Sequence, residues 1–169
     1  MNTKEPITVL LADDHQDIRK ELRKILDAES DIQVVGEAEN GLQAVEMARK
    51  LRPAVVVMDV VMPKLSGLDA TLQIRHFYLP ATKVLICSAY SDDAYVERAR
   101  AFGATGYIMK LNSAETLVAA VREIQKGNTF LSPTIAKSFN KQVKPAKLTL
   151  VKRPPTRKAP PTAPHAVVG

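Results

Sequence analysis

The sequence is poor in the features that mark disulfide-stabilised, membrane-spanning and secreted proteins. It has one cysteine, Cys87, among 169 residues, so no disulfide can form within the chain and a reducing compartment is expected. No apolar run approaches the roughly 20 residues that a membrane helix needs, because the longest, residues 54–62, is interrupted by Asp59. The N-terminus has no clean apolar segment followed by a cleavage site, so no signal peptide is expected. These absences together predict a cytoplasmic protein.

Acidic residues are absent from residues 140–169, and the net charge of +6 is therefore distributed unevenly. Residues 1–139 hold 17 Lys+Arg and 18 acidic residues, a net charge of −1, whereas residues 140–169 hold seven basic residues and no acid. The same segment contains six of the 11 prolines. Its composition predicts a disordered Pro/Lys-rich tail. Such a tail could contact acidic surfaces by charge attraction alone, or serve only as a solubilising linker.

Short β-branched and apolar runs alternate with amphipathic stretches, which is the pattern of βα units around a parallel sheet. The runs are apolar almost throughout, as expected of strands that helices cover on both faces. The predicted fold class is therefore α/β, a doubly wound parallel sheet of five strands with five flanking helices. The strands are expected at residues 7–13, 32–38, 54–59, 83–88 and 104–109, and the helices at 16–28, 41–52, 67–76, 91–103 and 112–127.

Capping residues place the ends of several of these helices. Ser91 is an N-cap candidate for the fourth helix, and Asn112 with Glu115 forms a capping-box pattern at the start of the fifth. Ser132-Pro133 is typical of the N-cap and first turn of one more short helix. The chain is thus expected to consist of a domain over residues 5–127, a short linker helix within residues 128–139 and the tail over residues 140–169.

Polar residues follow four of the predicted strands at the point where each strand ends. Asp13 and Asp14 follow the first strand, Asp59 ends the third, Ser88 the fourth, and Lys110 follows the fifth. In a parallel sheet these side chains crowd one rim, where three carboxylates repel one another unless a cation is present. Mg²⁺ prefers oxygen ligands and keeps several waters, so one or two carboxylates and a phosphoryl oxygen suffice. The set predicts phosphoryl transfer onto a carboxylate, with Asp59 as nucleophile.

The members of this set carry unequal weight when each is taken alone. Asp13 and Asp14 could equally form a solvated loop or a helix cap, and Ser88 alone is uninformative. Asp59 and Lys110 each interrupt an apolar run, where a charged residue usually has a partner or a function. The prediction rests on the occurrence of the whole set together at the ends of four strands. Outside the set, the isolated histidines His15 and His76 are interpreted as structural or surface residues, and His165 lies in the tail. Cys87 is interpreted as a core residue.

Several short segments match the motifs of one known family. They are Leu11-Ala12-Asp13-Asp14-His15, Asp59-Val60-Val61-Met62-Pro63 with Gly67 following, Ser88-Ala89, residues 35–38 and residues 103–110. In these segments the chain resembles the response regulator receiver family (CheY-like), over about residues 5–127. The resemblance implies a flavodoxin-like sheet with strand order 2-1-3-4-5. The receivers that the chain resembles most are of the NarL/FixJ type, which usually bear a C-terminal helix-turn-helix.

The resemblance implies a role for each site residue. Asp59 would accept the phosphoryl group, and Lys110 would pair first with the acceptor carboxylate and then with the phosphoryl group. Ser88 would move toward that group and Tyr107 would rotate inward behind it, switching the face formed by helix 4, strand 5 and helix 5. The implied Mg²⁺ ligands are Asp14, Asp59 and the backbone carbonyl of Val61, with Asp13 binding through water.

The resemblance also implies partners. A sensor histidine kinase or a phosphotransfer protein would donate the phosphoryl group, and an unidentified protein would receive the signal. The chain would catalyse only its own phosphorylation and dephosphorylation, so it is not expected to be an enzyme with an external product. The sequence leaves open which kinase and target these are, and whether the chain forms a homodimer through helices 1 and 5 or through helix 4, strand 5 and helix 5.

Two departures from the family pattern bear on these expectations. Many receivers have a proline two residues after the lysine that corresponds to Lys110, but here that position is Asn112. A cis Lys110–Leu111 peptide bond is therefore not inferred. A helix-turn-helix needs about 60 residues, but only residues 140–169 remain, and Pro154-Pro155 would interrupt its first helix. Sequence-specific DNA binding is therefore not expected.

Two other functions stay open from the sequence. One is a degenerate receiver that binds partners without phosphorylation, which the intact acidic residues, serine and lysine disfavour. The other is a flavodoxin-like or phosphatase enzyme on the same fold, which would need a glycine-rich loop after the first strand or a second carboxylate two residues after Asp59; neither is present. Val61 and Tyr90, each apolar or bulky, would flank the entry of attacking water, which predicts slow loss of the phosphoryl group.

Overall fold

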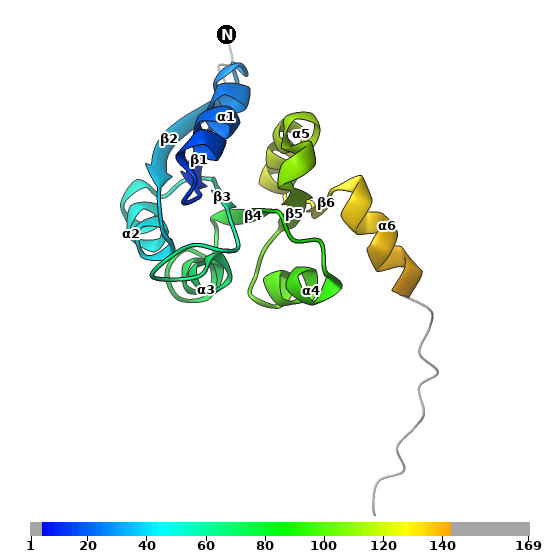
Figure 1. Ribbon diagram of the computed structural model, residues 1–169. Coiled ribbons are helices and arrows are strands. Elements are labelled where there is room, and N and C mark those ends of the chain that lie inside the picture. The colour runs from blue at the N-terminus through cyan, green and yellow to red at the C-terminus, as the bar shows by residue number, and fades with distance from the viewer. Residues whose placement is uncertain (1–4, 143–169) are drawn as a thin grey trace, which may run out of the picture.

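The structure, a computed structural model, describes residues 5–142 of the chain. It contains one six-stranded sheet and helices on both of its faces (Figure 1). The strands are β1 (Ile7–Ala12), β2 (Ile32–Ala38), β3 (Val55–Met58), β4 (Lys83–Ser88), β5 (Gly106–Met109) and β6 (Phe130–Leu131). The helices are α1 (Gln16–Asp27), α2 (Gly41–Leu51), α3 (Gly67–Leu72), the π-helix η1 (Gln73–Tyr78), α4 (Asp93–Ala101), the 3-10 helix η2 (Lys110–Asn112), α5 (Ser113–Gln125) and α6 (Pro133–Gln142).

Neighbouring strands all pair in parallel, in the order β2-β1-β3-β4-β5-β6. Helices α1 and α5 cover one face of the sheet, and α2, α3 and α4 cover the other (Figure 1). Side chains alternate between the two faces along each strand, so Val9 and Leu11 join the core under α1 and α5 while Leu10 and Ala12 join the core under α2 to α4. The predicted doubly wound α/β class and the order of the first five strands are confirmed.

The sheet has one strand more than the sequence predicted. Residues expected only as part of a linker form β6, which pairs with β5 through Gly106 and Tyr107. The chain then enters α6, which packs against β5, β6 and α4 and buries Ile135 completely. A two-residue strand is too short for a periodic pattern, which is why the sequence did not reveal it. The segment after α5 therefore covers part of the face formed by α4, β5 and α5.

Helix boundaries show where local patterns were sufficient. Asn40 caps α2, because its side chain accepts a hydrogen bond from the backbone N–H of Gln43 at 2.9 Å. The prediction that Ser91 caps α4 is wrong, since that helix begins after Asp92. Asn112 precedes α5 but makes no side-chain cap, so the predicted capping box does not form. The third helix also differs, because α3 continues as the π-helix η1 to residue 78.

None of the helices within residues 5–142 combines the length and the apolar character needed to cross a bilayer. Nearly all of the predicted tail, residues 143–169, lies outside the described residues.

In the loop after β3, the backbone of a glycine lies very close to the backbone at the start of the loop. The backbone N–H of Gly67 donates to the carbonyl of Val60 at 2.8 Å. A Cβ atom at Gly67 would lie 1.6 Å from the carbonyl oxygen of Asp59 and 2.8 Å from its carbonyl carbon. Both are backbone atoms, which cannot move aside as a side-chain end can. The conformation that follows Asp59 therefore requires glycine at this position.

We expect Gly67→Ala to lower the free energy of unfolding by roughly 1–3 kcal/mol or more, the range for forced overpacking. Gly36→Ala is the matched control, because a Cβ there meets only the side-chain ends of Met47, Leu51 and Leu10. Its cost should stay below about 1 kcal/mol. Urea denaturation of the two variants measures the difference, and equal losses would contradict the close approach at Gly67.

Candidate functional site

The register of the sheet brings the ends of β1, β3, β4 and β5 to one rim. Ala12 pairs with Met58, and the N–H of the following Asp59 donates to the carbonyl of Ala12 at 2.8 Å. Ser88 pairs with Met109 at the ends of the next two strands. The residues that immediately follow these positions therefore lie side by side, as the parallel sheet predicted.

Three carboxylates converge at this rim. Asp13, Asp14, Asp59 and the adjacent His15 each offer a ligand atom, and these atoms all lie within 4.8 Å of one another. Asp13 and Asp59 are 2% and 5% exposed, whereas Asp14 is exposed to solvent. The predicted meeting of the acidic side chains is confirmed. Two of the carboxylates are enclosed by protein and the third faces water, so the cluster is reached from solvent on the side of Asp14.

Lys110 bridges the two buried carboxylates. Its Nζ lies 2.6 Å from Oδ2 of Asp13 and 3.0 Å from Oδ2 of Asp59. Burial alone would lower the pKa of this ammonium group, but the hydrogen bond to Asp13 and the charge of Asp59 outweigh it, so its pKa is raised. The lysine is therefore a fixed positive charge, as the sequence predicted.

Asp59 is held in an environment that resists its own ionisation. Its Oδ1 accepts a hydrogen bond from the N–H of Val60 at 2.8 Å. Burial raises the pKa of the carboxyl and the charge of Asp13 raises it further, whereas Lys110 and the Val60 N–H lower it without cancelling the effect of burial. An additional cation would stabilise the ionised form, which is the form that can act as a nucleophile.

His15 corrects one interpretation made from the sequence. The sequence indicates an isolated histidine, but Nδ1 of His15 lies 3.0 Å from Asp14 Oδ1 and 3.2 Å from Asp13 Oδ1. Its backbone N–H also donates to Asp13 Oδ1 at 2.8 Å. The signal that could have found it was adjacency, because a residue directly after the acidic pair lies on the same turn. Its imidazole is largely exposed at the mouth of the site.

Ser88 and Tyr107 are connected through the backbone of Tyr90. The fully buried Ser88 accepts a hydrogen bond from the Tyr90 N–H at 3.1 Å, and the Tyr107 hydroxyl donates to the Tyr90 carbonyl at 2.7 Å. Tyr107 is 2% exposed and already lies inward, and burial raises the pKa of its phenol. The sequence did not predict that one backbone unit would link the two residues. This link forms a continuous path from the rim to β5.

Val61 and Cys87 complete the residues singled out from the sequence. The Val61 side chain is half exposed beside the site, and the part expected of its backbone carbonyl stays a prediction. Cys87 is buried, and burial raises the pKa of its thiol to about 12, so it is protonated at neutral pH. The interpretation of Cys87 as a core residue is confirmed.

The donor set fits a magnesium ion. Carboxylate oxygens are the ligands that Mg²⁺ prefers, and it keeps several waters when few carboxylates are available. Here three carboxylates share a space less than 5 Å across, and within residues 5–142 the ammonium group shown in contact with them is that of Lys110. Among the described residues, His15 is the one nitrogen ligand in the cluster. Asp13, Asp14 and Asp59 are therefore the residues that would hold the ion.

Comparisons with known proteins show which family the chain is similar to. The profile of the response regulator receiver domain family matches residues 9–122. The response regulator protein VraR of Staphylococcus aureus is 37% identical over 143 residues, which are 84% of this chain and 68% of VraR. The transcriptional regulatory protein DegU of Brevibacillus brevis is 35% identical over 136 residues; these are 80% of this chain but only 57% of the length of DegU.

Solved structures give the same result. A two-component response regulator of the LuxR family from Aurantimonas sp. SI85-9A1 superposes with a TM-score of 0.77 at 31% identity, over 81% of this chain and 97% of that one. The signal receiver domain of a NarL response regulator from Mycobacterium tuberculosis superposes with a TM-score of 0.71 at 33% identity, over 74% of this chain and 100% of that one.

The raised pKa of Asp59 predicts a stability that depends on pH. A carboxyl whose folded pKa is above its unfolded value favours folding below the unfolded pKa and loses that contribution as pH rises through the folded pKa. In EDTA at pH 7, Asp59→Asn should therefore raise the free energy of unfolding on the order of 1 kcal/mol, at the low end for neutralising buried ionic groups. Denaturant unfolding from pH 7 down to pH 4 should show this gain shrinking. A gain that is constant or grows toward low pH would contradict the assignment.

Proposed function

The chain belongs to the response regulator receiver domain family, and on that premise we propose that it is a phosphorylation switch whose phosphoacceptor is Asp59. The observation that carries the proposal is the contact of Lys110 with both Asp13 and Asp59 beside the exposed Asp14. A carboxylate nucleophile, a fixed cation and further oxygen ligands are the parts that phosphoryl transfer to an aspartate requires.

The residues of the site divide the chemistry among them. An oxygen of the Asp59 carboxylate attacks the phosphorus of the donor, and the bond from phosphorus to the donor's leaving atom breaks as the acyl phosphate forms. Lys110, 3.0 Å from Asp59 Oδ2, stabilises negative charge on the phosphoryl oxygens as the carboxylate charge is consumed. When bound, Mg²⁺ would supply further stabilisation of that charge. The product is a modified residue of the chain itself, so no external product is turned over.

The link through Tyr90 supplies the route by which the modification changes the surface. A phosphoryl group adds about −1.5 to −2 charges at neutral pH. If the Ser88 hydroxyl turns to a phosphoryl oxygen, the Tyr90 N–H loses its acceptor, and the loop that also holds the Tyr107 hydroxyl must rearrange. Tyr107 packs in the same core cluster as Val96 of α4 and Ile135 of α6. The face that changes therefore includes α4, β5 and the helix that covers them.

The donor and the recipient follow from the same chemistry. A histidine kinase or a phosphotransfer protein, whose phosphohistidine has a high transfer potential, would dock at the rim that carries Asp59. The recipient would read the face over α4 and β5. Formation of a homodimer, through this face or through α1 and α5, would be a second way in which the chain passes on the signal.

Incubation with acetyl phosphate and Mg²⁺, followed by intact mass, tests the acceptor. The wild-type chain should gain the mass of one phosphoryl group and Asp59→Asn should gain none, because an amide cannot form the acyl phosphate. Asp17→Asn, which removes an exposed carboxylate of α1 outside the site, is the control and should be modified like wild type. If both the wild type and Asp59→Asn gain the group, or neither does, Asp59 is not the acceptor.

The phosphoryl group should be lost slowly once formed. Tyr90 and Val61 stand beside the site, 43% and 50% exposed, and the Tyr90 ring packs against Tyr95 with centroids 5.1 Å apart. The apolar Val61 side chain offers attacking water no hydrogen-bond partner, and the bulky ring of Tyr90 would obstruct its approach. The phosphorylated wild type should persist for minutes or longer after donor removal, and Tyr90→Ala should lose the group faster. Intact mass against time measures both, and a wild-type lifetime of seconds would contradict the prediction.

A further inference from the structure

An arginine is buried beside the acidic rim although it takes no part in the chemistry described above. Arg19 lies on the first turns of α1 and is 4% exposed. A buried guanidinium is costly unless its donors are satisfied, because its charge and its N–H groups have left water. The partners of Arg19 therefore indicate why the sequence places it there.

Its shortest contact is to the backbone of the acidic pair. Nη1 of Arg19 donates to the carbonyl oxygen of Asp13 at 2.6 Å. This carbonyl belongs to the peptide unit that joins Asp13 to Asp14, so its orientation determines how the two carboxylates are directed. On its other side, the Asp13 N–H donates to the carbonyl of Ala38 at 3.1 Å. The backbone of Asp13, the first residue of the acidic loop formed by Asp13 and Asp14, is thus held at both its N–H and its carbonyl group.

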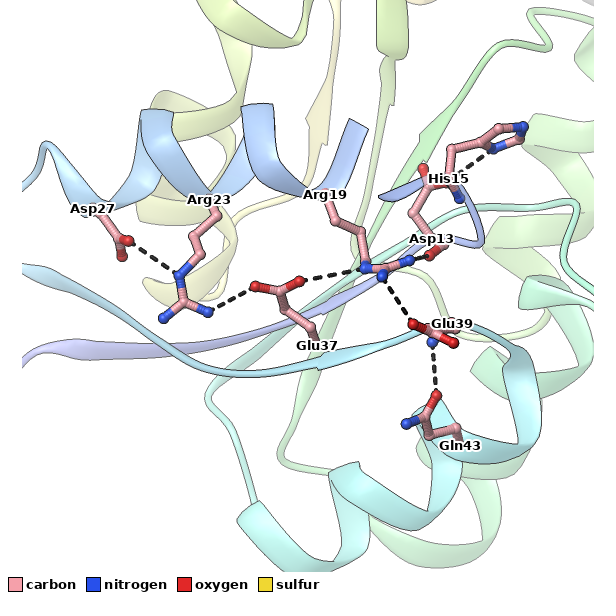
Figure 2. Close-up of polar contacts among 8 residues, drawn as sticks. All are labelled: Asp13, His15, Arg19, Arg23, Asp27, Glu37, Glu39 and Gln43. Atoms are coloured by element: carbon pink, nitrogen blue, oxygen red, sulfur yellow. Dashed lines mark hydrogen bonds and ion pairs between the residues drawn. The ribbon is translucent and has the colours of Figure 1, made fainter. Parts of the chain in front are cut away.

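Two further hydrogen bonds of Arg19 go to the end of β2 and the turn after it. Nε donates to Glu37 at 3.3 Å and Nη2 to Glu39 at 3.2 Å. Figure 2 shows the guanidinium between the two glutamates and Asp13, with Glu39 tied in turn to Gln43 of α2 through its backbone N–H. The planar fork of arginine fits three acceptors in fixed directions.

A second arginine provides a comparison within the same network. Arg23, one turn further along α1, donates to Glu37 at 2.7 Å and to Asp27 at 3.2 Å, and its side chain is 43% exposed. The hydrogen bond from Arg23 is the chief reason that the pKa of Glu37 is lowered. Arg23 thus shares a glutamate with Arg19 but is not shown to touch the acidic loop (Figure 2).

We propose that Arg19 is a positioning residue for the magnesium site, acting through its hydrogen bond to the Asp13 carbonyl. This inference rests on the proposed function, because it assumes that Asp13, Asp14 and Asp59 hold the ion. Residues that orient metal ligands change metal affinity when they are removed, although they never touch the metal.

The positive charge of Arg19 and its hydrogen bond to the Asp13 carbonyl have opposite expected effects on Mg²⁺ affinity, which makes the inference testable. Removing a cation near a magnesium site, and leaving Glu37 and Glu39 behind, should tighten Mg²⁺ binding if charge attraction decides. Releasing the Asp13–Asp14 peptide unit should weaken binding, because the ligands then have to be ordered when the ion binds. The sign of the change in affinity separates the two.

The experiment is a Mg²⁺ titration of the unphosphorylated full chain, followed by the ¹⁵N–¹H NMR shifts of the Asp13, Asp14 and Asp59 amides. Arg19→Met keeps the length and apolar stem of the side chain and removes the donors. It should raise the dissociation constant for Mg²⁺ by about 10-fold or more. In the metal-free state, the Asp13 amide of this variant should also exchange with solvent faster than in wild type.

Two further variants control for lost stability and for charge. Arg23→Met removes the neighbouring arginine and should change the Mg²⁺ dissociation constant by less than about twofold, as expected for an exposed pair. Arg19→Lys restores the charge without the fork and should still bind Mg²⁺ weakly. A thermal unfolding curve shows whether Arg19→Met is folded. If it is not, the Mg²⁺ affinity of Arg19→Lys provides the test instead.

The outcomes distinguish this inference from the proposed function. If wild type binds no Mg²⁺, the proposed magnesium site and this inference are both wrong. If wild type binds Mg²⁺ and the Arg19 variants bind it equally or more tightly, or if Arg19→Lys restores full affinity, the positioning role alone is overturned. Equal weakening in Arg19→Met and Arg23→Met would likewise overturn it, because the effect would then be a general loss of stability.

Discussion

The ammonium group of Lys110 between Asp13 and Asp59 is the interaction on which the rest of the site depends. The two carboxylates end up side by side because β1 and β3 are parallel neighbours in register, and both are buried because helices cover both faces of the sheet. Two buried like charges destabilise a fold unless a cation lies between them. Lys110 supplies one positive charge at 2.6 and 3.0 Å, which leaves the three-carboxylate site short of positive charge. Excess negative charge on oxygen ligands of this kind favours a hard divalent cation, which is why the proposed function includes one.

The same rim is supported from two sides by residues that never enter it. On one side, Arg19 ties the backbone of Asp13 to β2, so the acidic loop is fixed by α1 and by the neighbouring strand (Figure 2). On the other, the backbone of Tyr90 connects Ser88 to Tyr107 and so to the core under α4 and α6. In the proposed function, the rearrangement would take place on the second of these sides. The edge strand β6 and α6 place the segment after α5 directly against β5 and α4 on that side.

Sequence reasoning reached most of the fold because its signals were local and repeated. Five apolar runs with helical stretches between them determine a parallel sheet, and the polar residues that end those runs then fall on one edge. Features carried by one or two residues were missed or misplaced. The strand β6 has two residues, the capping box at Asn112 is not formed, and the extension of α3 into a π-helix has no periodic pattern of its own. Arg19 and His15 were missed because their significance lies in their contacts, not in their residue types.

The sequence by itself determined which groups end the strands, and therefore the chemical identity of the site: three carboxylates, a hydroxyl and an ammonium group. It could do so because strand direction follows from the alternation of strands and helices, and direction alone decides which end of each strand lies at the rim, whereas the strand order came only from the resemblance to the receiver family. Tertiary structure alone decided the distances, the burial of Asp13 and Asp59, and the partners of Arg19, Tyr90 and His15. These depend on register and side-chain packing between segments far apart in the chain, for which a single sequence carries no local signal.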